Sequence, residues 1–175
     1  LDGDLTLTGG TLDTSSSDHA LTVTGDVIIT AGTLTCNDST VNVGSYSMSG
    51  SASGATTVGA NGTLQINKRN ASGWACTIDN GTFTNNGELI MAFDGTTTSG
   101  GSSSTIYMKN GTGASHGKLT INCSDSSHFV FIGRYSTDPW LAGDVNVTSG
   151  KLSAADGVTN QNTSFNSLTI ESNGV

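Results

Sequence analysis

The sequence predicts an all-β protein, and within that class a β-solenoid, in which each strand stacks on its counterpart one coil later. Three observations favour this fold. Short runs carry apolar residues at alternate positions, several segments resemble one another, and no stretch shows apolar residues at helical spacing over three turns. Thr, Ser, Gly and Asn are abundant while the strong helix formers are scarce. Residues 1–175 are therefore expected to form a single β-repeat domain.

The repeat is clearest in three near copies of one phrase. The copies read GDLTLTGGTLDT from Gly3, GDVIITAGTLTC from Gly25 and GDVNVTSGKLSA from Gly143. In each copy Gly-Asp opens an alternating run, a Gly closes it, and a second run begins with Leu shortly afterwards. This order is typical of a strand, a turn and a second strand.

Seven alternating segments are expected as strands, with Leu, Val or Ile on one side and mostly Thr, Asn or Gln on the other. They are residues 5–8, 21–24, 41–43, 63–66, 118–121, 145–148 and 167–170. The alternation also predicts a register. The side chains expected to point inward are Leu5, Leu7, Val27, Ile29, Val145 and Val147, and burial of Thr6, Ile28 and Asn146 instead would contradict it.

A shorter phrase, G-[TK]-[LF], sets the expected number of coils. It recurs at uneven spacing, at Gly10, Gly32, Gly62, Gly81, Gly117 and Gly150. With roughly 20 residues per coil, the chain would form about eight irregular coils. The alternative is a β-sandwich or jelly roll, in which the Asn-Gly pairs would make hairpin turns. The likeness between segments favours the solenoid, because stacked coils place equivalent positions in equivalent environments.

Composition disfavours several classes of partner. The net charge is −8 with only six Lys and Arg, so nucleic acid is not expected as a partner. No apolar run approaches the ~18 residues of a membrane span, so insertion into a membrane is not expected.

The scattered cysteines Cys36, Cys76 and Cys123 are expected to be small apolar fillers. Since the chain begins at Leu1, it is expected to be a fragment of a longer chain.

The sequence contains no motif that predicts catalysis, a metal site or a cofactor. Asp2 and Asp4 have D-x-D spacing but lack the glycine-rich calcium signature, and the histidines have no partner pattern. Solenoid enzymes that cut polysaccharides use two carboxylates together with many sugar-binding aromatic and basic side chains, which are scarce here. The expectation is a protein that is not an enzyme and holds no cofactor.

Two stretches combine aromatic and basic residues and are the candidate contact sites. They are residues 67–74, NKRNASGW, and residues 128–140, HFVFIGRYSTDPW. Exposed Trp, Tyr and Arg often anchor interfaces, although the same aromatic residues also fill cores. The residues expected to contact another subunit or a ligand are Arg69, Trp74, Arg134, Tyr135 and Trp140.

Residues 5–35, LTLTGGTLDTSSSDHALTVTGDVIITAGTLT, resemble the repeats of tailed-phage virion structural proteins, bacterial β-strand-repeat surface proteins and autotransporter-like adhesins. The resemblance implies an extracellular or virion β-solenoid. The expected function is a structural component of a virion or extracellular fibre, such as a tail fibre, spike or decoration protein, that acts by self-assembly and adhesion. Its expected partners are copies of itself, other structural subunits and surface glycan. The alternatives are a cell-surface adhesin that binds glycan and a tailspike-like polysaccharide depolymerase.

Overall fold

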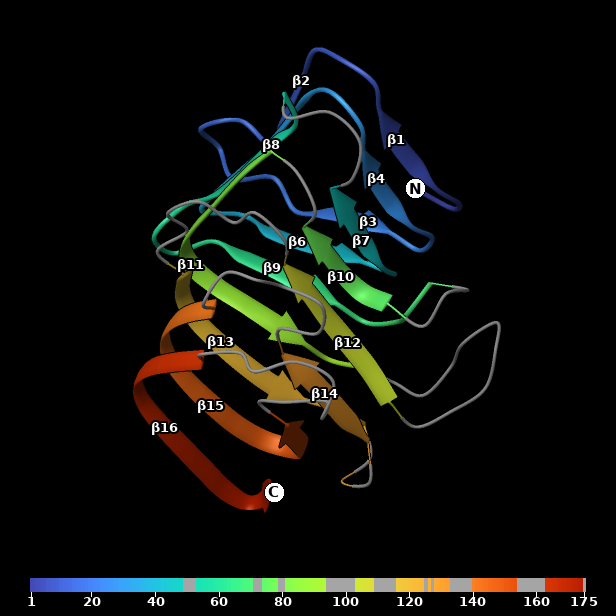
Figure 1. Ribbon diagram of the computed structural model, residues 1–175. Helices are drawn as coiled ribbons and strands as arrows, with labels where there is room; N and C mark the ends of the chain where they lie inside the picture. Colours follow the sequence, from blue (N-terminus) through green and yellow to red (C-terminus); the bar gives the residue numbers. More distant parts are fainter. Residues whose placement is uncertain are drawn as a thin grey trace.

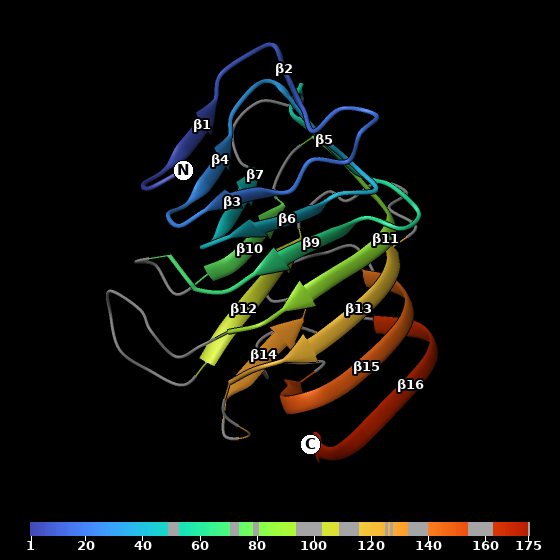
Figure 2. The same ribbon diagram turned by 180° about the vertical axis from the view of Figure 1, so that it is seen from behind.

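The computed structural model is a coil of short parallel strands, and no helix occurs among the residues that it describes (Figure 1). The description covers residues 1–48, 53–70, 74–78, 81–93, 103–108, 116–124, 126, 128–132, 140–153 and 163–174. Figures 1 and 2 show the two ends of the chain at opposite ends of the stack. The predicted all-β class and the solenoid are therefore confirmed.

Three faces of the coil carry the strands. The first face is formed by β1 (Leu5–Leu7), β4 (Val27–Ile29), β7 (Tyr46–Met48), β10 (Trp74–Ile78), β12 (Ser103–Met108) and β14 (Phe129–Ile132). The second begins with β2 (Thr11–Asp13), β5 (Thr33–Asn37) and β8 (Ala55–Val58), and the third with β3 (Leu21–Val23), β6 (Thr40–Val43) and β9 (Thr63–Ile66). Each strand pairs in parallel with the strand one turn later on the same face.

Later in the chain, long strands bend across the corner between the second and third faces. They are β11 (Thr82–Met91), β13 (His116–Asn122), β15 (Trp140–Ser153) and β16 (Thr163–Gly174). The first of them, β11, pairs with β8 through residues 82–85 and with β9 through residues 88–91. The last residues of β15 return to the first face, where they pair with β14. All these pairings are parallel, so the alternative of an antiparallel sandwich or jelly roll is wrong.

The expected eight coils are also wrong, because the turns differ in length. Val27 pairs with Tyr46, 19 residues later, whereas Tyr46 pairs with Cys76, 30 residues later. From β1 to β14 the coil makes about five turns, and β15 and β16 extend the stack beyond that point. A uniform turn of roughly 20 residues overestimates the number of coils because loops of variable length at the corners are tolerated.

The short phrase G-[TK]-[LF] marks strand starts on all three faces. It opens β2, β5 and β11 on the second face, where Gly10, Gly32 and Gly81 precede the strands. Gly62 and Gly117 introduce the third-face segments of β9 and β13, and Gly150 lies where β15 returns to the first face. The phrase therefore identifies a strand start, and its spacing does not measure the length of one turn.

The interior is a continuous apolar column, and the predicted register is confirmed. Val27, Ile29, Val145 and Val147 are at most 1% exposed, whereas Leu5 and Leu7 are partly buried at the end of the column and pack against it. Thr6 is exposed, and Ile28 and Asn146 are only partly buried. The first and second copies of the long phrase stack directly, since Leu5 pairs with Val27 and Leu12 pairs with Leu34.

Candidate functional site

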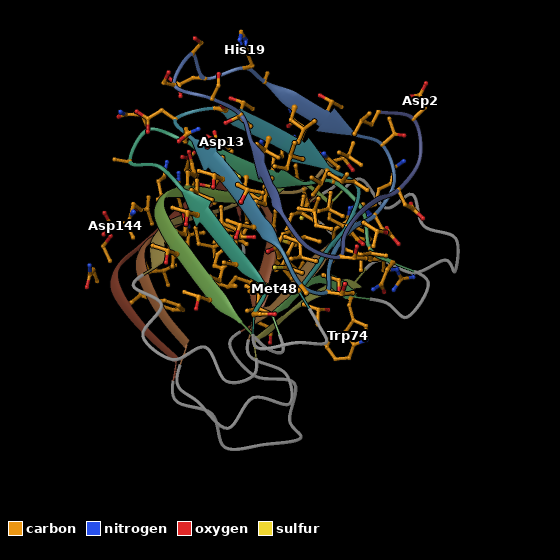
Figure 3. The ribbon with its side chains drawn as sticks, turned by 90° about the horizontal axis from the view of Figure 1, so that it is seen from above. Asp2, Asp13, His19, Met48, Trp74 and Asp144 are labelled. Carbon is orange, nitrogen blue, oxygen red and sulfur yellow. The ribbon has the colours of Figure 1, made fainter. Side chains whose placement is uncertain are left out.

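The first predicted contact stretch lies at the corner before β10. The backbone N–H of Asn70 donates to the carbonyl of Trp74 (2.7 Å), and the N–H of Trp74 donates to Asn70 Oδ1 (3.0 Å). These two bonds fix the start of β10, where Trp74 pairs in register with Thr105. Figure 3 shows the Trp74 side chain at the periphery of the coil. Arg69 and Trp74 are both partly buried, and both have interactions within the chain.

The second predicted contact stretch falls largely outside the description. Arg134 and Tyr135 lie outside the described residues. Trp140 is the first residue of β15, and its backbone pairs with Thr163, but its side chain is not among those described. The interface role of these residues therefore stays a prediction.

A shallow polar hollow lies over the corner that the long strands cross. It encloses about 390 Å³ and is lined by Asn85, Asn86, Gly117, Lys118, Gly143, Asp144 and Asn166. Asn85 is 1% exposed, and its Oδ1 accepts from the N–H of Gly87 (3.1 Å). Its buried Nδ2 has no hydrogen-bond partner among the described residues. Buried amide groups normally have partners, so this nitrogen is an exception to the usual pairing of buried polar groups.

Two lining residues of this hollow, Lys118 and Asp144, interact with side chains outside its lining. Lys118 Nζ lies 3.0 Å from Glu88 Oε1, and the same carboxylate oxygen accepts from the Thr120 hydroxyl. One turn further on, the Ser167 hydroxyl donates to Asp144 Oδ1 (2.7 Å). The hollow thus presents both hydrogen-bond donors and hydrogen-bond acceptors.

The most distinctive surface is the end of the coil at β16. This strand pairs with β15, which places Leu168 over Val145 and Ile170 over Val147. The two valines are buried, whereas Leu168 is 50% and Ile170 is 53% exposed. In a parallel ladder, paired residues point to the same side, so both side chains face the interior of the coil. Among the described strands, none borders the outer edge of β16.

The opposite end of the coil carries an equivalent edge. The backbone of Thr22 and Thr24 points outward from β3, and Leu1 occupies part of this edge. The Leu1 ammonium donates to the Thr22 carbonyl (2.7 Å), and the Thr24 N–H donates to the Leu1 carbonyl (3.0 Å). These are the two bonds of a parallel bridge, and they place Leu1 beside Val23. Leu1 is 65% exposed.

The sequence pattern did not identify Leu168 and Ile170 as exposed residues at an end of the coil. The signal was present in the sequence, since SLTI at residues 167–170 is an alternating segment near the end of the chain. Nothing in the segment itself distinguishes it from KLTI at residues 118–121, which lies in the middle of the stack. Exposure at the end depends on what stacks on the strand and not on its own residues.

The cysteines are buried in the core, as predicted. Cys36 and Cys76 are 0% exposed and Cys123 is 3% exposed, and all three belong to the hydrophobic cluster. Burial raises the pKa of the Cys36 and Cys76 thiols to about 12 and that of the Cys123 thiol to about 11. Thiols that stay protonated are poor nucleophiles and poor metal ligands.

The described residues contain no cluster of three or more His, Cys, Asp or Glu side chains placed to hold a metal ion. Within the described part of the chain, no helix has the length and apolar character that a membrane span requires.

The fold and its open ends define the chain as a β-solenoid repeat protein. Comparisons with protein-family models, with curated proteins and with solved structures gave no match.

Proposed function

We propose that this chain is a non-catalytic structural component of an extracellular fibre or a virion, and that it acts by self-assembly and adhesion. The observation that carries the proposal is the open apolar end of the coil, where Leu168 and Ile170 are half exposed. Unpaired strand edges are sites at which another chain adds, and soluble monomers usually protect them. An exposed edge with an apolar interior beside it suits a subunit whose partners cover it.

The rest of the molecule supports a mechanical role. The buried column along the coil and the continuous parallel ladder make a stiff rod, because each turn is held by its neighbours on both sides. Charged residues make up only 11% of the chain, so few charges need to be desolvated when two such surfaces meet.

Electron microscopy of the purified chain tests the proposal when it is combined with a digestion assay. The proposal expects linear or lattice-like particles and no release of reducing ends from bacterial or algal polysaccharides. The Trp74→Ala/Trp140→Ala double variant is expected to weaken lateral association while leaving the β-rich circular dichroism spectrum unchanged. A stable monomer that cleaves a polysaccharide would contradict the proposal and favour a depolymerase.

A glycan-binding adhesin is a second candidate, and the polar hollow at Asn85, Lys118 and Asp144 favours it. Binding to a glycan array would test it, with Lys118→Gln as the variant. Lys68→Gln is the matched control, because Lys68 is exposed and lies outside this hollow. Glycan binding that falls for Lys118→Gln alone would support the adhesin, and equal binding by both variants and the parent would exclude this hollow as the site.

A further inference from the structure

The uncovered end of the coil continues the apolar columns of the interior. One column on the third face contains Leu21, Val41, Leu64, Leu89, Leu119, Val145 and Leu168 in successive turns. A second contains Val23, Val43, Ile66, Met91, Ile121, Val147 and Ile170. The internal members of both columns are buried, Leu21 at the first turn is partly buried, and Leu168 and Ile170 at the β16 end are exposed. One further turn would bury Leu168 and Ile170.

The first and last third-face segments are nearly identical in sequence. Residues 21–23 read Leu-Thr-Val, and residues 168–170 read Leu-Thr-Ile. Both place Thr outward, and both Thr22 and Thr169 are exposed. Every internal turn already stacks one such segment on another, so the two end segments have the shape and register to stack on each other.

We propose that a second copy of this chain covers the β16 end, with its own N-terminal turn stacked on β16 in parallel register. Leu168 of one copy lies over Leu21 of the next, and Ile170 takes the place of Leu1 beside Val23. Ile170 then makes the two backbone bonds to Thr22 and Thr24 that Leu1 makes in the single chain. This inference rests on the proposed assembly function and names the contact through which assembly occurs.

Parallel head-to-tail stacking is favoured over a two-fold contact because of the order of the three faces. A two-fold axis through the third face would reverse the strands and place the first face of one copy over the second face of the other. Head-to-tail stacking keeps every face over its counterpart and continues the same ladder. A contact between two different ends does not close on itself, so it generates an open filament.

Charge near the junction predicts its dependence on salt. Asp2, Asp4 and Glu171 are exposed, and they come together when Glu171 follows Ile170 into the position beside Thr24. Like charges repel more weakly when salt screens them, so association is expected to strengthen as the salt concentration rises from ~0.01 M to ~0.15 M.

Sedimentation velocity on the chain of residues 1–175 tests the contact with variants at each end. Leu168→Lys/Ile170→Lys is expected to weaken association at least ~100-fold, because two ammonium groups would be buried between apolar turns. Thr169→Lys is the matched control, since Thr169 lies between them on the same strand and is exposed on the outside. Deletion of Leu1 and Asp2 is expected to strengthen association, because the position beside Val23 is then vacant.

Mixing decides the direction of the contact. Leu21→Lys is expected to block the N-terminal end. Thr22→Pro is expected to block it independently, because proline removes the outward N–H of residue 22. Leu21 and Val23 can still pair with β6 in this variant. Each blocked variant alone is expected to be monomeric. A 1:1 mixture of Leu168→Lys/Ile170→Lys with either N-terminal variant is expected to form dimers and nothing larger, since one productive pair of ends remains.

The outcomes separate this contact from the proposed function. Filaments that persist in Leu168→Lys/Ile170→Lys would overturn the end-to-end contact and leave assembly intact through another surface. Dimers formed by Leu21→Lys or Thr22→Pro alone would overturn the head-to-tail direction. A parent chain that stays monomeric at every concentration and salt condition would overturn both the contact and the assembly function.

Discussion

At the scale of single residues, Tyr46 and Thr56 form a fully buried polar pair in the interior. The Tyr46 hydroxyl and Thr56 Oγ1 lie 2.6 Å apart, and both residues are at most 1% exposed. The Tyr46 ring also meets Phe83 edge-on at a centroid distance of 5.9 Å. Burial raises the pKa of Tyr46 well above its ordinary value, so the hydroxyl keeps its proton. The pair is stabilising because each group satisfies the other where water cannot reach.

Removing one partner of this pair is expected to cost more than removing both. Tyr46→Phe leaves the Thr56 hydroxyl buried without a partner and should lower the unfolding free energy by about 1–3 kcal/mol. Adding Thr56→Val should recover part of that loss, because no buried polar group is then unsatisfied. Urea denaturation of the two single variants and the double variant measures the coupling. Additive losses would show that the two hydroxyl groups do not interact.

The buried thiols predict how stability changes at alkaline pH. The pKa of the folded Cys36 and Cys76 thiols is about 12, whereas the ordinary value is 9.0. Above that ordinary value the unfolded chain loses protons that the folded chain keeps, so the unfolding free energy should fall as the pH rises from ~9 towards ~12. Chemical denaturation across this range checks the slope. Cys36→Ala/Cys76→Ala should have a shallower slope, and an unchanged slope would contradict the assignment.

At the scale of elements, glycine columns allow successive turns to approach at the corners. A Cβ on Gly117 would lie 2.1 Å from the carbonyl oxygen of Gly87, and a Cβ on Gly87 would lie 2.3 Å from those of Gly59 and Gly62. Backbone atoms cannot move aside as a flexible side chain does. The corner between the second and third faces therefore requires glycine, which explains why β11 and β13 can bend across it without a break.

This close approach predicts different costs for two glycine substitutions. Gly117→Ala is expected to lower the unfolding free energy by roughly 1–3 kcal/mol, because the turns must separate to admit the methyl group. Gly9→Ala is the matched control, since its Cβ would lie 3.9 Å from the carbonyl oxygen of Ala31, an ordinary contact. Thermal unfolding of both variants compares them. Equal unfolding temperatures of the two variants would show that the corner accommodates a methyl group.

At the scale of the whole molecule, stability should be greatest in the middle of the stack. Turns such as that of β9 have neighbours on both sides, whereas β1 and β16 each pair with one neighbour among the described strands. In a molecule built from stacked units, the end units open most easily.

Hydrogen exchange read out by mass spectrometry checks this gradient. Amides of β6 and β9 are expected to exchange more slowly than those of β1 and β16 in dilute, monomeric protein. If copies stack end to end, protection of β16 should rise with protein concentration while that of β9 stays constant. Uniform protection along the chain at low concentration would contradict a gradient of stability.

Much of the fold was predictable from local patterns, but the candidate site was not. The inward register of Val27 and Ile29 follows from alternation alone, since a slip by one residue would expose every apolar side chain. The strand at Tyr46–Met48 was not predicted because it has only three residues, and the strand at Trp74–Ile78 was not predicted because a bulge interrupts its alternation. Among the predicted contact residues, Arg69 and Trp74 are both partly buried, and both have interactions within the chain.

The sequence by itself determined that this chain is built from repeated strands with one apolar side, because alternation and repetition are written into neighbouring residues. Only the tertiary structure decided that the turns are unequal, that one phrase serves three faces, and that Leu168 and Ile170 lie at an open end. The physical reason is that the side of the strand to which a side chain points is set by the strand's own residues. Its exposure depends on the strand that stacks against it, and that neighbour is distant in sequence.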